Sequence, residues 1–309
     1  MAAGIRHWQK VRHSIAGGMA ALSLLLSGCA AGPSALAERP PAGAVPGPAL
    51  WRLSDADTTI YLFGTVHALP QGTQWLDARV QRAFDASEEL VTEVDLATMR
   101  ASGQSLAGAG MLPEGQSLRD LMQPDNREEF EAALVTLGLP VEAFDRMEPW
   151  LAAMSLSLLP VVRAGYQADA GVESALASKA EGKTRSGLER IEDQIALFDT
   201  LPMAAQLAYL DQAVHQMPSA SSSLDAMVAE WLAGDAEDLA ALINAEVTDS
   251  DLHARLLTRR NANWAGWIAD RLNRPGTVFV AVGAGHLAGD GSVQDQLRDR
   301  GLQVTRVWQ

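Results

Sequence analysis

Two segments near opposite ends of the chain have the same order: an apolar strand, the pattern Gly-x-x-His, a loop, a short helix and a second strand. The first pattern, GTVH (64–67), follows the alternating run 58–63, and the second, GAGH (283–286), follows the continuous apolar run 277–283. A continuous apolar run is typical of a strand that is buried on both faces of a sheet. The two ends of the chain are therefore predicted to meet in one sheet that is covered by helices.

The predicted fold is a single α/β domain over residues 50–309. Residues 50–54 and 58–63 form a hairpin, and the chain is mainly helical from about Ala97 to Arg274. We predict a mixed central sheet built from the N- and C-terminal strand–helix–strand units, with a large helical insertion between them. If each unit contributes parallel strands, the loops at their carboxyl ends lie at one edge of the sheet, where α/β sites usually form.

Two histidines occupy matching positions in these loops, His67 and His286. Either one alone would more often be a hydrogen-bonded structural residue, but the pair favours a site. Glu93 and Asp95 lie two apart in the next predicted strand, so their side chains are expected on one face. A His–Glu–His set of His67, Glu93 and His286 can bind a divalent ion and leave positions for water and substrate. Such an ion lowers the pKa of bound water and polarises a carbonyl, so the expected chemistry is hydrolysis.

The second strands of the two units also share letters, VTEVD (91–95) and VTRVW (304–308). Glu93 of the first unit matches Arg306 of the second, which makes Arg306 a candidate substrate-binding residue. Two tryptophans, Trp264 and Trp267, recur at near-helical spacing, and we expect them to pack in the core and not to stack on a ligand.

The first 28 residues have the features of an export signal. Three basic residues precede an apolar stretch, 15–27, that is too short to span a bilayer as a mature helix. It ends in LSGC (26–29), which resembles the lipobox of bacterial lipoproteins. We predict a signal peptide, lipidation of Cys29, and a protein anchored in the cell envelope, on the periplasmic side of the outer membrane. The alternative is an uncleaved anchor with an incidental cysteine.

Residues 29–49 are rich in Ala, Pro and Gly and lack apolar periodicity, which is typical of a flexible tether. Without residues 1–28, which hold three of the 24 basic residues and none of the 38 acidic ones, the net charge is −17. A basic surface for nucleic acid is therefore not expected. The single cysteine of the chain is Cys29, which excludes a disulfide or a thiol nucleophile in the predicted domain.

Taken together, GTVH, VTEVD and GAGH make the chain similar to the TraB/PrgY/GumN family, which includes the TIKI metalloproteases. The family is more distantly similar to erythromycin esterases and to haem-binding ChaN lipoproteins. The resemblance covers about residues 50–309 and extends to four further stretches: MEPWLAAM (147–154), GLERIEDQ (187–194), RNANW (260–264) and FVAVGAGHLAGDGSV (279–293).

The resemblance implies a TIKI-like or erythromycin-esterase-like fold and a hydrolase that cleaves peptides or proteins with the help of Mn, Co or Zn. It implies His67, Glu93 and His286 as metal ligands. It also implies that Asp95 or Glu189 orients or deprotonates the water. The residues that it implies as supports of the metal ligands or as substrate contacts are Asp95, Glu189, Arg260 and Asn261.

Structural alternatives remain for several of these residues. A surface salt bridge explains Glu189 as well as a site role does. Arg260 is also explained by a structural ion pair, and Asn261 by capping of the backbone. Two residues depart from the family pattern: Glu173 in GVES stands where an Asp is expected, and Arg190 stands where a Thr is common. The roles of Glu173 and Glu189 are therefore open.

Other functions are weighed against this hypothesis. GAGHLA fits a loose dinucleotide fingerprint, but the chain ends too soon after it for the rest of a nucleotide fold. No G-x-S-x-G or HExxH occurs, which disfavours a serine hydrolase and a zincin. The remaining alternatives are a metal-free hydrolase, in which Glu93 orients a general-base histidine, and a lipoprotein that binds a metal, haem or a peptide signal without turnover.

Overall fold

A six-stranded mixed sheet forms the centre of the fold, in the order β6-β4-β7-β2-β1-β8. The computed structural model describes residues 47–102, 108–246 and 250–308. The strands are β1 (Leu50–Ser54), β2 (Thr58–Thr65), β4 (Glu89–Thr92), β6 (Thr184–Gly187), β7 (Gly276–Gly283) and β8 (Thr305–Arg306). This mixed α/β architecture with a helical insertion confirms the predicted fold class.

Both end units contribute parallel strands, as the sequence predicts. In the first unit, β2 leads through α2 (Ala78–Ala86) to β4, and both strands run parallel to β7. In the second, β7 leads through α14 (Val293–Asp299) to β8, which pairs antiparallel with β1. Because β1 is itself antiparallel to β2, strand β8 has the same direction as β2. However, β4 and β8 lie on opposite sides of the central β7–β2 pair in the strand order, so the matched second strands are far apart in the sheet.

The insertion between the units contains most of the helices and one strand of the main sheet. Its helices are α3 (Leu96–Ser102), α4 (Leu118–Leu121), α5 (Pro124–Thr136), α6 (Pro149–Arg163), α7 (Val172–Lys179), α8 (Ile191–Asp199), α9 (Met203–Gln216), α10 (Ala220–Ala233), α11 (Ala236–Glu246), α12 (Ser250–His253) and α13 (Arg259–Arg271). The edge strand β6 was not expected in the insertion. It is polar and pairs only with β4, so its sequence lacks the apolar alternation from which a strand is predicted. A small second sheet pairs β3 (Leu69–Pro70) with β5 (Tyr166–Gln167).

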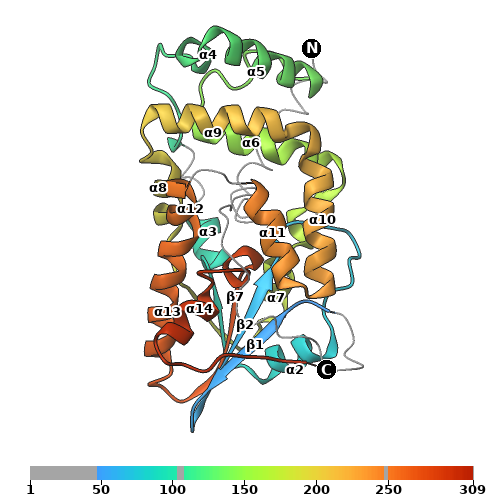
Figure 1. The fold of residues 1–309 in the computed structure, drawn as a ribbon, viewed down its shortest axis with the longest axis vertical. Helices are drawn as coiled ribbons and strands as arrows, with labels where there is room; N and C mark the ends of the chain where they lie inside the picture. The colour runs from blue at the N-terminus through green and yellow to red at the C-terminus, as the bar shows by residue number, and fades with distance from the viewer. Residues whose placement is uncertain (1–46, 103–107, 247–249, 309) are drawn as a thin grey trace.

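Three apolar cores hold these layers together. One lies on each face of the sheet, and a third joins α5, α6, α8 and α9. Figure 1 shows α4, α5, α6 and α9 in the half of the molecule toward which the arrow of β2 points, with α13 and α14 beside the sheet. The carboxyl ends of β2 and β7 therefore face these helices, and the residues that directly follow these two strands are buried.

The described part of the chain begins at Gly47, within the segment expected to be a tether, and its first residues are packed. Pro48 accepts a hydrogen bond from Arg79 (3.2 Å), and Ala49 is buried. The signal peptide and Cys29 lie outside the described residues. None of the helices in the described ranges is long and apolar enough to cross a membrane.

Candidate functional site

The two Gly-x-x-His loops lie in direct contact at the carboxyl edge of the sheet. They follow the neighbouring parallel strands β2 and β7, whose register places Thr65 opposite Gly283. A Cβ on Gly64 would lie 3.0 Å from the Cα of Ala284, so the glycine permits this close approach of the two backbones. The repeated pattern thus brings both histidines to one buried region.

His286 is fully buried, and its ring orientation is fixed from both sides. Its Nδ1 lies 2.6 Å from Oδ1 of Asn261, whose Nδ2 donates to the carbonyl of Gly291 (2.9 Å). Because the amide oxygen of Asn261 faces the ring, Nδ1 carries the proton and Nε2 carries the lone pair. Burial and the neighbouring charge of Arg260 lower the pKa of His286 to about 3, so the imidazole is neutral at physiological pH.

Arg260, on α13, is the cation at the centre of the cluster and is 6% exposed. All three of its nitrogens are engaged, and they bridge four partners. Nε and Nη2 donate to Glu189 (2.9 Å each), Nη2 also donates to Glu93 (2.7 Å), and Nη1 donates to the Leu256 carbonyl (2.9 Å) and to Nε2 of His286 (3.0 Å). Arg260 therefore forms the ion pairs expected of a structural residue, and these ion pairs lie within the site.

Glu93 follows strand β4 and is turned into the same cluster. Its Oε1 accepts the backbone N–H of Gly283 (2.8 Å), and its Oε2 accepts Arg260 Nη2 and Gln194 Nε2 (3.0 Å). Burial by itself would raise the pKa of Glu93. The charge of Arg260, the two neighbouring histidines and the backbone N–H of Gly283 together outweigh burial and lower the pKa well below its ordinary value, so Glu93 is a carboxylate.

His67 is paired with Glu173, a contact that the sequence does not reveal. Nδ1 of His67 lies 2.6 Å from Oε1 of Glu173, which also accepts the hydroxyl of Thr65. The contact is short enough for an ion pair, although its angle is outside the range of a hydrogen bond. Burial lowers the pKa of His67, but the contact with Glu173 and the charge of Glu93 together outweigh burial and raise it. Among the described residues, Nε2 of His67 has no hydrogen-bond partner.

The segment around Glu173 is fitted closely against the loop of His67. Val172 donates its backbone N–H to the carbonyl of Val66 (3.0 Å). A Cβ on Gly171 would lie only 2.0 Å from the carbonyl oxygen of His67, so only glycine fits there without movement. Helix α7 therefore begins directly against the loop and places its first carboxylate beside the imidazole.

Glu189 and Trp264 complete the cluster on the side of α13. Trp264 donates its Nε1 to Glu189 (2.9 Å), and its ring lies 4.2 Å from the ring of His286 and 4.7 Å from the guanidinium of Arg260. The tryptophan is buried, as expected, and it also contacts the site, which its helical spacing could not indicate.

Two of the sequence-predicted site residues lie elsewhere. Asp95 accepts the backbone N–H and the hydroxyl of Thr98, so it caps α3. The expected alternation with Glu93 fails because β4 ends at Thr92. Arg306 is on β8, at the opposite edge of the sheet from Glu93, where it donates to the carbonyl of Gly234 (2.7 Å) and stacks on Trp51.

The ligand atoms of His67, Glu93 and His286 do not all lie within 4.8 Å of one another. Nε2 of His286 is 3.7 Å from Oε1 of Glu93, with the guanidinium of Arg260 against both residues. The three predicted ligands are buried close together: Glu93 influences the pKa of both histidines, and both histidines influence the pKa of Glu93. In the described arrangement they do not form a closed three-ligand set.

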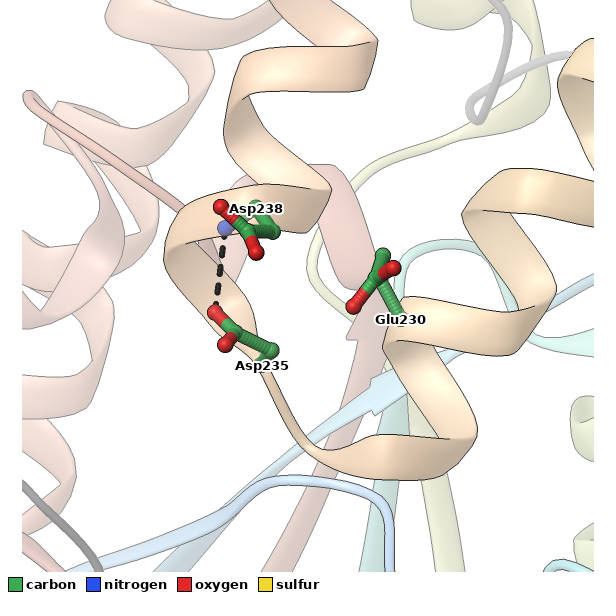
Figure 2. Close-up of side chains that lie close together, drawn as sticks. All are labelled: Glu230, Asp235 and Asp238. Carbon is green, nitrogen blue, oxygen red and sulfur yellow. Dashed lines mark hydrogen bonds between the residues drawn. The ribbon is translucent and has the colours of Figure 1, made fainter.

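A separate acidic group lies at the turn between α10 and α11. Glu230, Asp235 and Asp238 have carboxylate oxygens within 4.8 Å of one another (Figure 2), which is the one such group of three in the described part of the chain. Asp235 accepts the backbone N–H of Asp238 (3.0 Å), as drawn in Figure 2, and so caps α11. The group is largely exposed, and helix capping accounts for the position of Asp235.

Comparisons with known proteins place the chain among bacterial and animal relatives. It is 26% identical over 240 residues to the protein YbaP of Escherichia coli, covering 77% of this chain and 87% of YbaP. It is 25% identical over 299 residues to the metalloprotease TIKI2 of Danio rerio, covering 79% of this chain and 57% of TIKI2. A Treponema pallidum protein is 23% identical over 269 residues, covering 82% and 80% of the two chains.

No solved structure matches the chain. The model of the TraB/PrgY/gumN family matches residues 49–306, a range that includes both histidine loops, Glu93 and the whole helical insertion. The chain therefore belongs to the TraB/PrgY/gumN family.

Proposed function

We propose that the protein is a metal-dependent hydrolase that cleaves peptide bonds in the cell envelope. The observation that carries the proposal is that the loops of His67 and His286 lie in contact and that Glu93 lies beside His286, with all three side chains buried. The similarity to proteins named metalloprotease, TIKI1 and TIKI2, supports peptide bonds as the substrate class. Since this chain spans 57% to 62% of their length, their activity is a proposal for this chain.

The residue types at the site fit a divalent cation. Two acidic side chains, Glu93 and Glu189, pair with Arg260, and a third, Glu173, lies beside His67, in a region that is largely closed to solvent. An excess of buried acidic groups favours an added cation, because uncompensated charge is costly away from water. Nitrogen and oxygen donors of this kind suit Mn, Co or Zn.

The unpartnered Nε2 of His67 supplies a second argument for the ion. Its Nε2 is buried without a partner among the described residues, while Glu173 lies against Nδ1. A carboxylate behind a histidine is the usual support of a metal-bound imidazole. His67, Glu93 and His286 would hold the ion, but Arg260 has to leave Glu93 and His286 first.

The ion, when bound, supplies a Lewis acid for the scissile carbonyl and lowers the pKa of water. The chain itself favours the ionised form of Glu93 through the backbone N–H of Gly283, and through Asn261 it holds the proton of His286 on Nδ1 and the lone pair on Nε2. Glu189 is the candidate proton acceptor, since it belongs to the same cluster.

The proposed place of action is the outer membrane, with the domain held on the periplasmic side by lipidated Cys29. This proposal is supported by the export signal and the lipobox-like sequence of residues 26–29. Labelling the expressed protein with a radioactive fatty acid tests it, with Cys29→Ser as the control that should lose the label.

Elemental analysis of protein purified without chelator, followed by cleavage of a peptide library with and without Mn, Co or Zn, tests the proposed function. His67→Ala and His286→Ala should lose both bound metal and cleavage, whereas His253→Ala, outside the cluster, should retain them. The proposal is wrong if the two site variants fold and keep their metal content and cleavage.

The metal-free hydrolase and the non-catalytic binding protein predict different results in the same assays. Cleavage that persists in EDTA supports a metal-free mechanism. The carboxylate that would orient the imidazole of His67 in such a mechanism is Glu173, and not Glu93, because Glu173 lies beside the ring. Ligand binding without turnover supports a binding protein, and a Soret band after addition of haem would identify haem as the ligand.

A further inference from the structure

We propose that Arg260 is a built-in competitor of the metal ion. Its guanidinium occupies the ligand atoms of Glu93 and His286, so an ion binds to both residues only after Arg260 has turned away. The inference rests on the proposed function for the identity of the ligands, and it assigns the described arrangement to the metal-free form.

Competition at His286 follows from the chemistry of its ring. The proton of a neutral imidazole occupies one nitrogen, and the contact with Asn261 places it on Nδ1. The single remaining lone pair is on Nε2, where Arg260 Nη1 donates at 3.0 Å. A lone pair cannot accept this hydrogen bond and bind a metal ion at the same time.

Competition at Glu93 follows from charge and position. Nη2 of Arg260 lies 2.7 Å from Oε2 of Glu93, and the backbone N–H of Gly283 holds Oε1 at 2.8 Å. The guanidinium already compensates the carboxylate, and its positive charge repels a cation at the same place. The same residue therefore opposes the ion at two of its three proposed ligands.

The structure also offers Arg260 an anchor for the open position. Nε and Nη2 both donate to Glu189, which is the two-point contact that suits a guanidinium. Trp264 holds Glu189 through its Nε1 and supports the guanidinium with its ring, 4.7 Å away. Glu189 and Trp264 would retain Arg260 after its contacts to Glu93 and His286 are lost.

The experiment is a calorimetric titration of the apo-protein with Zn²⁺ or Mn²⁺ alone. Arg260→Gln should bind the ion about tenfold more tightly than the wild type, or tighter still, because the competing hydrogen bonds and the repelling charge are removed. His286→Asn in the Arg260→Gln background should abolish this gain. Equal or weaker binding by Arg260→Gln, or a gain that persists without His286, overturns the proposal.

Arg271→Gln is the matched control, since Arg271 lies on the same helix and is buried against Glu89 (2.9 Å), outside the cluster. It should leave ion affinity unchanged. If Arg260→Gln does not fold, Arg260→Lys replaces it, because a single ammonium cannot bridge four partners. The lysine variant should also bind the ion more tightly than the wild type, and no gain would equally overturn the proposal.

The results distinguish this inference from the proposed function. A wild-type protein that binds metal and cleaves peptides, combined with no gain in Arg260→Gln, refutes only the competition. A gain in Arg260→Gln that needs His286, in a protein that cleaves no peptide under any condition, refutes only the hydrolase.

Discussion

Nη1 of Arg260 lies 3.0 Å from Nε2 of His286, inside a cluster from which solvent is largely excluded. A permanent cation at this distance makes a second positive charge on the imidazole costly. Burial, together with this contact, lowers the pKa of His286 to about 3. It also couples the folding of the domain to pH.

The apo-protein should lose stability as pH falls from about 6.5 toward 5. The folded pKa of His286 lies below the ordinary value of 6.5, so the unfolded chain takes up the proton first and is favoured by acid. This residue contributes a slope of up to about 1.4 kcal/mol per pH unit in the free energy of unfolding. Urea unfolding in EDTA at several pH values measures it.

The control for this pH dependence has to account for His253, whose pKa is also lowered by burial. His286→Asn should flatten the slope, and His253→Asn should retain the part that His286 contributes. A slope that is the same in the wild type and in His286→Asn would contradict the assignment.

Glu173→Gln should lower the pKa of His67. Burial already lowers this pKa, and in the native protein the contact with Glu173 and the charge of Glu93 together outweigh burial. Removal of the charge leaves the effect of burial dominant. An NMR titration of the ring measures the shift, with His67→Gln to assign the signal. Glu129→Gln is the matched control, since Glu129 pairs with His215 at the exposed surface (3.4 Å) and should leave the His67 signal unchanged.

The general plan of the fold could be predicted because it depends on local patterns of apolar residues in the sequence. The apolar run of β7 and the alternation of β2 reflect their burial, and the helix in each unit explains why the two strands of that unit run in the same direction. Strand β6 escaped prediction because its four residues, Thr184–Gly187, are polar and largely exposed at the sheet edge. Its only signal is its pairing with β4, which is a tertiary contact.

The residues of the candidate site also fall into those that the sequence indicates and those that depend on tertiary contacts. His67 and His286 could be found from their matching positions, and Glu93 from the strand between them. The contact of Glu173 with His67 could not be found, because its partners Thr65 and His67 are more than 100 residues away in the sequence. The match of Glu93 with Arg306 misled for a topological reason: β4 and β8 take opposite sides of the sheet.

Asn261→Leu should destabilise the protein by about 1–3 kcal/mol for each polar group that it leaves unpaired. The substitution removes the acceptor for Nδ1 of His286 and the donor for the Gly291 carbonyl. Asn263→Leu, on the exposed face of the same helix, should change stability by less than about 0.5 kcal/mol. Chemical denaturation compares the two variants, and equal losses would show that Asn261 has no special role in holding the ring.

Gly171→Ala tests whether the start of α7 positions His67. A Cβ at this residue would lie 2.0 Å from the carbonyl oxygen of His67, so the loop or the helix has to move, at a cost of about 1–3 kcal/mol. Gly266→Ala adds the same methyl group to α13, where no heavy atom lies within 4 Å, and should stabilise the helix by about 0.5–1 kcal/mol. Thermal unfolding gives the two stabilities, and NMR of the His67 ring reports its displacement. Opposite signs for the two variants, with a shifted His67 signal in Gly171→Ala alone, are the expected result. An unchanged His67 signal in Gly171→Ala would mean that the loop holds its histidine without help from α7.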